Sequence, residues 1–161
     1  MRYMFPRALQ GGLLVLLPLL LLGLGLRAEV TEMGQGAETK YEVQLIWATN
    51  DKKSPNPEHK PVEPEIRKKL DELPLRWENY FEVNRKEFTV SKGGRVRESL
   101  SEKCAVEIRD LDGKQVEVKL FDKAGKAVLE RRQPLARGEI LLVSGNAPAK
   151  TAWFVAIKPV K

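Results

Sequence analysis

The chain has 161 residues, of which 28 are basic and 22 acidic, with one cysteine and one histidine. A single cysteine excludes an intrachain disulfide, and a single histidine without cysteine neighbours excludes the usual transition-metal sites. The formal net charge of +6 suggests an acidic partner, but three arginines in the first 27 residues supply half of it. The remaining charges are interspersed in sign, so the composition predicts no nucleic-acid partner.

The N-terminus has the features of an export signal. Two arginines precede an apolar run over residues 8–26, and Arg-Ala-Glu follows at 27–29. Cleavage after Ala28 and cleavage after Gly25 each fit part of the expected pattern. The run is also about 19 residues long, enough to span a bilayer if it is not cut. We expect residues 1–28 to be a signal peptide or an uncleaved membrane anchor, and the body to be periplasmic or extracellular, touching the membrane only through this segment.

A polar segment without periodicity follows at 29–40 and predicts a disordered tether. The domain itself is expected over 41–161. Its first strand is predicted at 41–47, where apolar side chains alternate with polar ones and so share one face. These side chains are Tyr41, Val43, Leu45 and Trp47.

Prolines and charged residues dominate 49–64 and predict a surface loop, which contains His59. A proline at the first helical position, acids in the first turn and an i, i+4, i+7 apolar stripe predict a helix over about 64–73. Pro74 should end it. Such a short helix must lie on the sheet. The stripe consists of Ile66, Leu70 and Leu73.

Three aromatic residues, Trp77, Tyr80 and Phe81, fall within five positions after the helix. One interpretation is a hydrophobic plug between helix and sheet, because aromatic side chains dominate core burial. The other is a partly exposed anchor for a partner. We take Trp77 and Tyr80 as the candidate binding residues and keep the core interpretation as the alternative.

Further strands are predicted at 81–84, 87–91 and 95–100, with a glycine turn at 93–94. Two hairpins with alternating apolar residues then occupy 103–132. In these hairpins Cys104 shares the inward face with its apolar neighbours, so its thiol should be buried.

The register of the first hairpin has two solutions. A three-residue loop ending at Gly113 pairs Ile108 with Val116 and gives a glycine the left-handed position. A loop closed by Leu111 and Gln115 gives better charge pairs across the strands, but it moves a lysine to that left-handed position. We favour the glycine register.

Two nearly continuous apolar runs, 139–143 and 151–157, are predicted to be the central strands, covered on both faces. Trp153 and Phe154 should then point to opposite sides. The predicted fold is mainly β: an antiparallel β-sandwich or flattened barrel of about eight or nine strands with one short helix.

No pattern in the sequence assembles a catalytic centre. His59 lies in a proline-rich loop without an evident nucleophile, and Asp110 to Gly113 lacks the spacing of a calcium loop. We therefore expect no catalytic residue, no metal ligand and no cofactor. The predicted function is non-catalytic binding or a structural role, with a protein or glycan of the cell envelope as partner; a small secreted enzyme or an enzyme inhibitor is the alternative.

A set of core-like segments lies at 46–51, 77–86, 116–120, 137–139 and 151–155. These segments resemble a group of small exported bacterial proteins of unassigned function. The resemblance covers most of the chain after the N-terminal segment. It implies a domain of the bacterial envelope and brings no catalytic residue.

Overall fold

The computed structural model describes residues 37–144 and 151–160. The predicted signal or anchor segment, 1–28, and most of the predicted tether lie outside the described residues. In the part that is described, no helix is long and apolar enough to cross a membrane.

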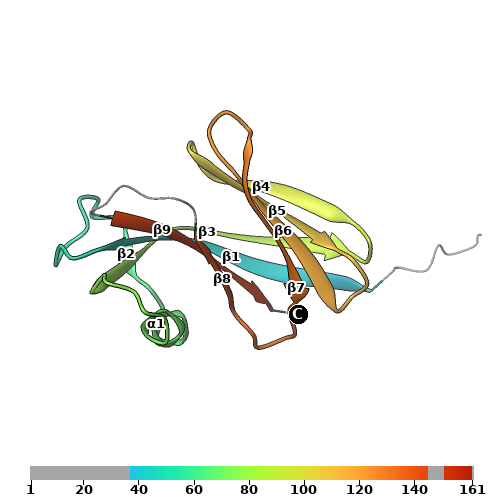
Figure 1. Cartoon of the computed structure of the whole chain (residues 1–161), viewed down its shortest axis with the longest axis horizontal. Coiled ribbons are helices and arrows are strands. Elements are labelled where there is room, and N and C mark those ends of the chain that lie inside the picture. Colours follow the sequence, from blue (N-terminus) through green and yellow to red (C-terminus); the bar gives the residue numbers. More distant parts are fainter. Residues whose placement is uncertain (1–36, 145–150, 161) are drawn as a thin grey trace, which may run out of the picture. The chain divides into compact units, whose positions relative to one another are not determined.

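The described chain forms nine antiparallel strands in two sheets and one helix (Figure 1). The five-stranded sheet has the order β2 (Lys60–Pro61), β3 (Asn79–Ser91), β1 (Glu38–Thr49), β9 (Thr151–Pro159), β8 (Leu141–Ser144). The four-stranded sheet has the order β4 (Arg95–Ser101), β5 (Cys104–Asp110), β6 (Gln115–Phe121), β7 (Ala127–Pro134). The helix is α1 (Pro64–Asp71). This arrangement confirms the mainly β prediction and is a sandwich rather than a closed barrel.

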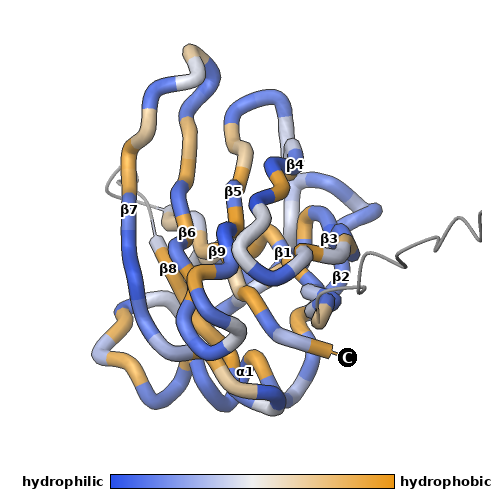
Figure 2. The backbone as a smooth tube through the Cα atoms, turned by 90° about the vertical axis from the view of Figure 1, so that its right-hand side faces the viewer, coloured by the Kyte–Doolittle hydropathy of each residue, from blue (hydrophilic) through white to orange (hydrophobic). Residues whose placement is uncertain are grey.

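Two cores lie on the two faces of the five-stranded sheet. The inner core lies between the sheets and combines β1 and β9 with β5 and β6. The outer core lies between the five-stranded sheet and α1. Figure 2 shows α1 on one side of β1, β8 and β9, with β5, β6 and β7 on the other. The central strands β1 and β9 are therefore covered on both faces.

The prediction of the two central strands is half correct. β9 is central, but β8 is an edge strand that pairs only with β9. The other central strand is β1, which lies between β3 and β9. β8 is apolar on both faces because the two cores cover it from both sides, whatever its neighbours in the sheet. β1 looked half-buried because it carries Glu42 and Gln44 on its helix side, although both residues are buried.

The first hairpin adopts the register that we did not favour. Val118, not Val116, lies opposite Ile108. Gly113 still has a positive φ of 80°, but it occupies the middle of the loop. Two aspartate side chains hold this loop: the Asp110 carboxylate accepts from the Gly113 N–H at 2.7 Å, and the Asp112 carboxylate accepts from the next two N–H groups at 2.8 and 2.6 Å. Because Gly113 keeps the left-handed position in this register, the glycine argument does not oppose it, and the aspartate bonds stabilise the loop. The register also places Glu107 opposite Lys119 and Arg109 opposite Glu117.

Three element boundaries also differ from the prediction. The tether prediction ran too far, because Glu38 to Lys40 already pair with β3. The strands predicted at 81–84 and 87–91 are one continuous strand, β3. The helix ends at Asp71, so Leu73 does not extend its apolar stripe and is 41% exposed, while Ile66 and Leu70 are buried. The proline that follows Leu73 disfavours helical geometry there.

Candidate functional site: a cleft between the two sheets

An aromatic row crosses the inner face of the five-stranded sheet near one end. Trp47 on β1 lies opposite Phe81 on β3 and opposite Trp153 on β9, so the three residues share one rung and one face. The ring centroids of Trp47 and Phe81 are 6.1 Å apart. The core between the sheets extends along this face to Leu45 and Val155, one inward-facing rung before the row.

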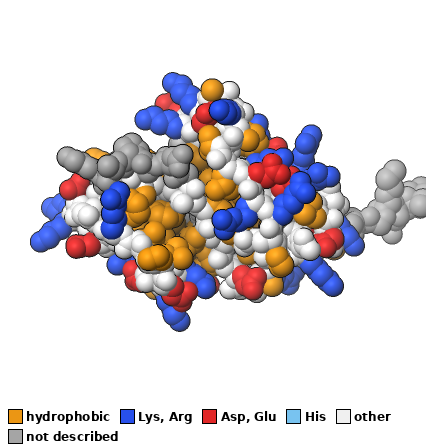
Figure 3. Space-filling view, in the orientation of Figure 1, with side chains coloured by type: hydrophobic (Ala, Val, Ile, Leu, Met, Phe, Trp, Pro, Cys, Tyr) orange, Lys and Arg blue, Asp and Glu red, His pale blue; other side chains and the backbone are white. Residues whose placement is uncertain are grey.

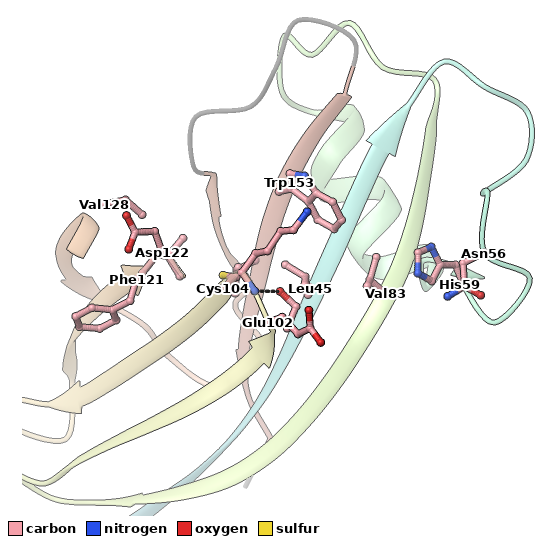
Figure 4. A pocket seen from close by; sticks show the side chains of 14 residues that line it. Leu45, Asn56, His59, Val83, Glu102, Cys104, Phe121, Asp122, Val128 and Trp153 are labelled. Carbon is pink, nitrogen blue, oxygen red and sulfur yellow. Dashed lines mark hydrogen bonds between the residues drawn. The ribbon is translucent and has the colours of Figure 1, made fainter. Parts of the chain in front are cut away.

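A cleft of about 760 Å³ opens beside this row, between the two sheets. Its volume falls within the roughly 300–1,000 Å³ typical of small-molecule sites. One wall comes from β1, β3 and β9, and the other from the starts of β5 and β7 and the end of β6 (Figure 4). The apolar lining consists of Leu45, Val83, Cys104, Leu120, Phe121, Val128, Trp153 and Val155.

The floor of the cleft is aliphatic, whereas its mouth exposes apolar side chains to solvent. Leu45, Leu120 and Val155 are buried. Val128 is 53% exposed and Trp153 is 39% exposed. Of the three large hydrophobic side chains that are exposed in the described chain, these two line the same cleft. The face shown in Figure 3 carries charges of both signs in mixture, and apolar side chains also gather on it in the left half of the view. An apolar surface gathered at one concave place is typical of a binding site.

The rim of the cleft is polar and has no cationic excess. Glu102 and Lys103 come from the β4–β5 turn, and Asp122 comes from the β6–β7 turn. The Asp122 carboxylate accepts hydrogen bonds from two backbone N–H groups of its own turn, each at 2.9 Å. Asn56 and His59 complete the rim from the loop after β1. The rim can therefore donate and accept hydrogen bonds. It carries two acidic side chains, Glu102 and Asp122, and one lysine, Lys103.

His59 is not the isolated surface residue that the sequence suggested. Its Nδ1 lies 2.7 Å from the Ser54 hydroxyl, and its ring meets Trp47 edge-on at 6.4 Å between centroids. The Ser54 oxygen also accepts from the Asn56 N–H, and the His59 N–H donates to the Asn56 carbonyl. These bonds lie within one loop and fix its shape. In this shape the loop presents the His59 ring to Trp47.

Cys104 is only partly buried and lines the cleft, which corrects the prediction of a fully buried thiol. It begins β5, where the inner face of the sandwich starts to open, so the inward-facing residues that follow it, Val106 and Ile108, are more buried than it is. Burial raises the pKa of its thiol. The group is therefore protonated at neutral pH and weakly nucleophilic.

The two residues proposed from the sequence lie elsewhere, on the helix side of the five-stranded sheet. Tyr80 is 4% exposed and packs edge-on against Phe154 in the outer core, with the Arg67 guanidinium 5.0 Å from its ring centre. Trp77 is half-buried against the same Phe154, and the Arg76 guanidinium lies 5.2 Å from its ring centre. This placement favours the core interpretation for Tyr80 and leaves only part of Trp77 at the surface.

A charged network joins α1 to the same side of the sheet. Arg85 on β3 pairs with Glu42 at 3.1 Å and with Glu63 at 2.6 Å. Lys158 on β9 contacts Glu42 and Glu65 at 3.4 Å each. Since Glu63 and Glu65 lie at the start of α1, the network fixes this end of the helix to the two strands.

The pKa of Glu42 reflects this network. Burial is the largest single influence and raises the pKa, but the hydrogen bond from Gln44 and the charges of Lys158 and Arg85 together lower it below its ordinary value. Glu42 is thus ionised in the folded state at neutral pH. Its role is to hold cations, and it lies outside the cleft.

Among the residues that the structure describes, no group of three or more histidine, cysteine or acidic side chains has an arrangement that could hold a metal ion. The cleft can bury apolar groups, and its rim can form hydrogen bonds. Fold and cleft define the class as an antiparallel β-sandwich with one covering helix and an apolar cleft between its sheets. No family model matches this chain, and no curated protein and no solved structure matches it either.

Trp153 and Val128 were not predicted to be site residues from the sequence. Trp153 lies in a continuous apolar run, which indicated a strand covered on both faces. Its alternation did place it opposite to Phe154, as expected, since Phe154 belongs to the outer core. The apolar pattern of β9 gives no information on where the four-stranded sheet ends.

Proposed function

We propose that the chain is an exported, non-catalytic binding domain of the bacterial cell envelope that holds an apolar part of its ligand in the cleft between the two sheets. Export is supported by the arginine-flanked apolar run at the N-terminus. Binding is supported by one observation above all: Trp153 and Val128 remain exposed over a buried aliphatic floor. Covering this surface releases roughly 25 cal/mol for each Å² of apolar area removed from water.

The test uses Nile red, a neutral apolar dye that fluoresces when it leaves water. Val128→Arg places a long charged side chain at the mouth of the cleft, at a position exposed enough to tolerate it. Leu73→Arg is the matched control, because Leu73 is also an exposed apolar residue but lies in the turn after α1. We expect the first variant to lose most of the dye binding and the second to keep it, with equal urea midpoints for both.

Equal dye binding by the two folded variants would contradict the proposal, because the dye would then bind elsewhere. Export is tested separately by cell fractionation and N-terminal sequencing of the mature protein. A cytoplasmic product that begins at Met1 would contradict that part.

A further inference from the structure

We propose that the ligand of the cleft is a single-chain amphiphile, with one aliphatic chain lying between the sheets and an uncharged polar head at the rim. This inference rests on the proposed function and names the class of its ligand. It follows from the chemistry of the floor, from the volume and from the charges of the rim.

The floor selects for an aliphatic chain. Leu45 and Val155 come from one sheet and Leu120 from the other, so a bound group is enclosed by branched aliphatic side chains on two sides. A bare sugar ring would bring hydroxyl groups into contact with these residues, where they find no hydrogen-bond partner and lose their water. An aliphatic chain has no such cost and gains from each buried methylene.

The mouth accommodates the transition from chain to head group. Trp153 contributes an aromatic face there, and an indole with one apolar and one polar side suits such a boundary. The cleft volume of about 760 Å³ is larger than a single side chain needs and leaves room for a flexible chain. A flexible chain can follow the cleft, whereas a rigid ring cannot.

The rim selects against an anionic head. A carboxylate could pair with Lys103, but it would share the rim with Glu102 and Asp122, whose negative charges oppose it. Hydroxyl groups can both donate to these carboxylates and accept from Lys103 or Asn56. The head that suits the rim best is therefore uncharged and rich in hydroxyl groups, as in a glycolipid.

The probes are n-alkyl β-glucosides from hexyl to dodecyl, with glucose and dodecanoate as comparisons, titrated below their aggregation concentrations by calorimetry. We expect no measurable binding of glucose. For the glucosides we expect the affinity to rise up to about fourfold for each added methylene, until the chain fills the cleft. Dodecanoate should bind several-fold more weakly than dodecyl glucoside. Val128→Arg should remove the dependence on chain length, and Leu73→Arg should keep it.

The possible outcomes separate this inference from the proposed function. Glucosides that bind no better than glucose, or that do not bind at all, would overturn the aliphatic-chain proposal while Nile red binding in the cleft still stands. Tighter binding of dodecanoate than of dodecyl glucoside would overturn the uncharged head. A chain-length dependence that is identical in Val128→Arg and the unmodified protein would place the chain outside the cleft and overturn this inference, whereas the Nile red comparison decides the proposed function.

Discussion

The packing of α1 on the sheet can be tested with two leucines that lie three positions apart. Leu70 is 0% exposed and belongs to the outer core with Ile66 and Phe154, whereas Leu73 follows the end of the helix and is 41% exposed. Truncating a buried leucine to alanine removes its contacts and leaves a cavity, at a cost of about 2 to 5 kcal/mol. The same change at an exposed position costs at most about 0.5 kcal/mol.

We therefore expect Leu70→Ala to lower the free energy of unfolding by about 3 kcal/mol and Leu73→Ala to leave it almost unchanged. Since domains of this size have a total stability of roughly 5 to 15 kcal/mol, Leu70→Ala should still fold. Urea denaturation followed by circular dichroism measures both variants. With a slope of roughly 2 kcal/mol per molar urea, the midpoint should fall by about 1.5 M in the first variant only. Equal midpoints for the two variants would refute the packing of α1 over the sheet.

Three further predictions concern single groups. Gly113→Ala should cost about 1 kcal/mol, because φ is 80° there and no atom obstructs the new Cβ, and Gly113→Asn should cost less; equal stability of all three proteins would contradict the left-handed loop. The folded pKa of Glu42 lies below its ordinary 4.5, so its contribution to stability is complete above pH 4.5 and is lost as the pH falls through the lowered value. Urea midpoints should thus fall on acidification, and fall less in Glu42→Gln than in the unmodified protein; the same acid dependence in both would contradict the role of the network. Cys104 should react slowly with a disulfide reagent in the folded protein, faster in urea, and more slowly still with dodecyl glucoside in the cleft; no effect of the glucoside would argue against occupancy of the cleft.

The sequence predicts the strands of this fold well because their side chains alternate visibly. The alternation in β5 and β6 reflects burial of one face by the other sheet, and the apolar run of β9 reflects burial of both faces. It fails at β1, because Glu42 and Gln44 are polar and yet buried: Glu42 pairs with Arg85 and Lys158 from distant parts of the chain, and Gln44 donates to Glu42. A polar residue in a pattern is normally interpreted as exposed.

The candidate site is harder to predict because it depends on where the layers end. The inward face of Trp153 follows from its position in β9, but its exposure depends on where the four-stranded sheet ends, beside Cys104 and Leu120. Nothing local to residue 153 carries this information. The aromatic residues after α1 were predicted to be a binding site because they are close together in the sequence. Tyr80, however, is directed into the outer core.

The most direct test of the cleft as the binding site is a titration of the protein with decyl glucoside, followed by the three tryptophan indole N–H signals in a two-dimensional nitrogen–proton NMR spectrum. The signals are assigned with Trp153→Phe and Trp77→Phe. Binding in the cleft predicts that the Trp153 signal shifts in proportion to occupancy while the Trp77 signal, on the helix side of the sheet, stays in place. A shift of the Trp77 signal with an unchanged Trp153 signal would contradict the cleft and return the site to the surface beside α1.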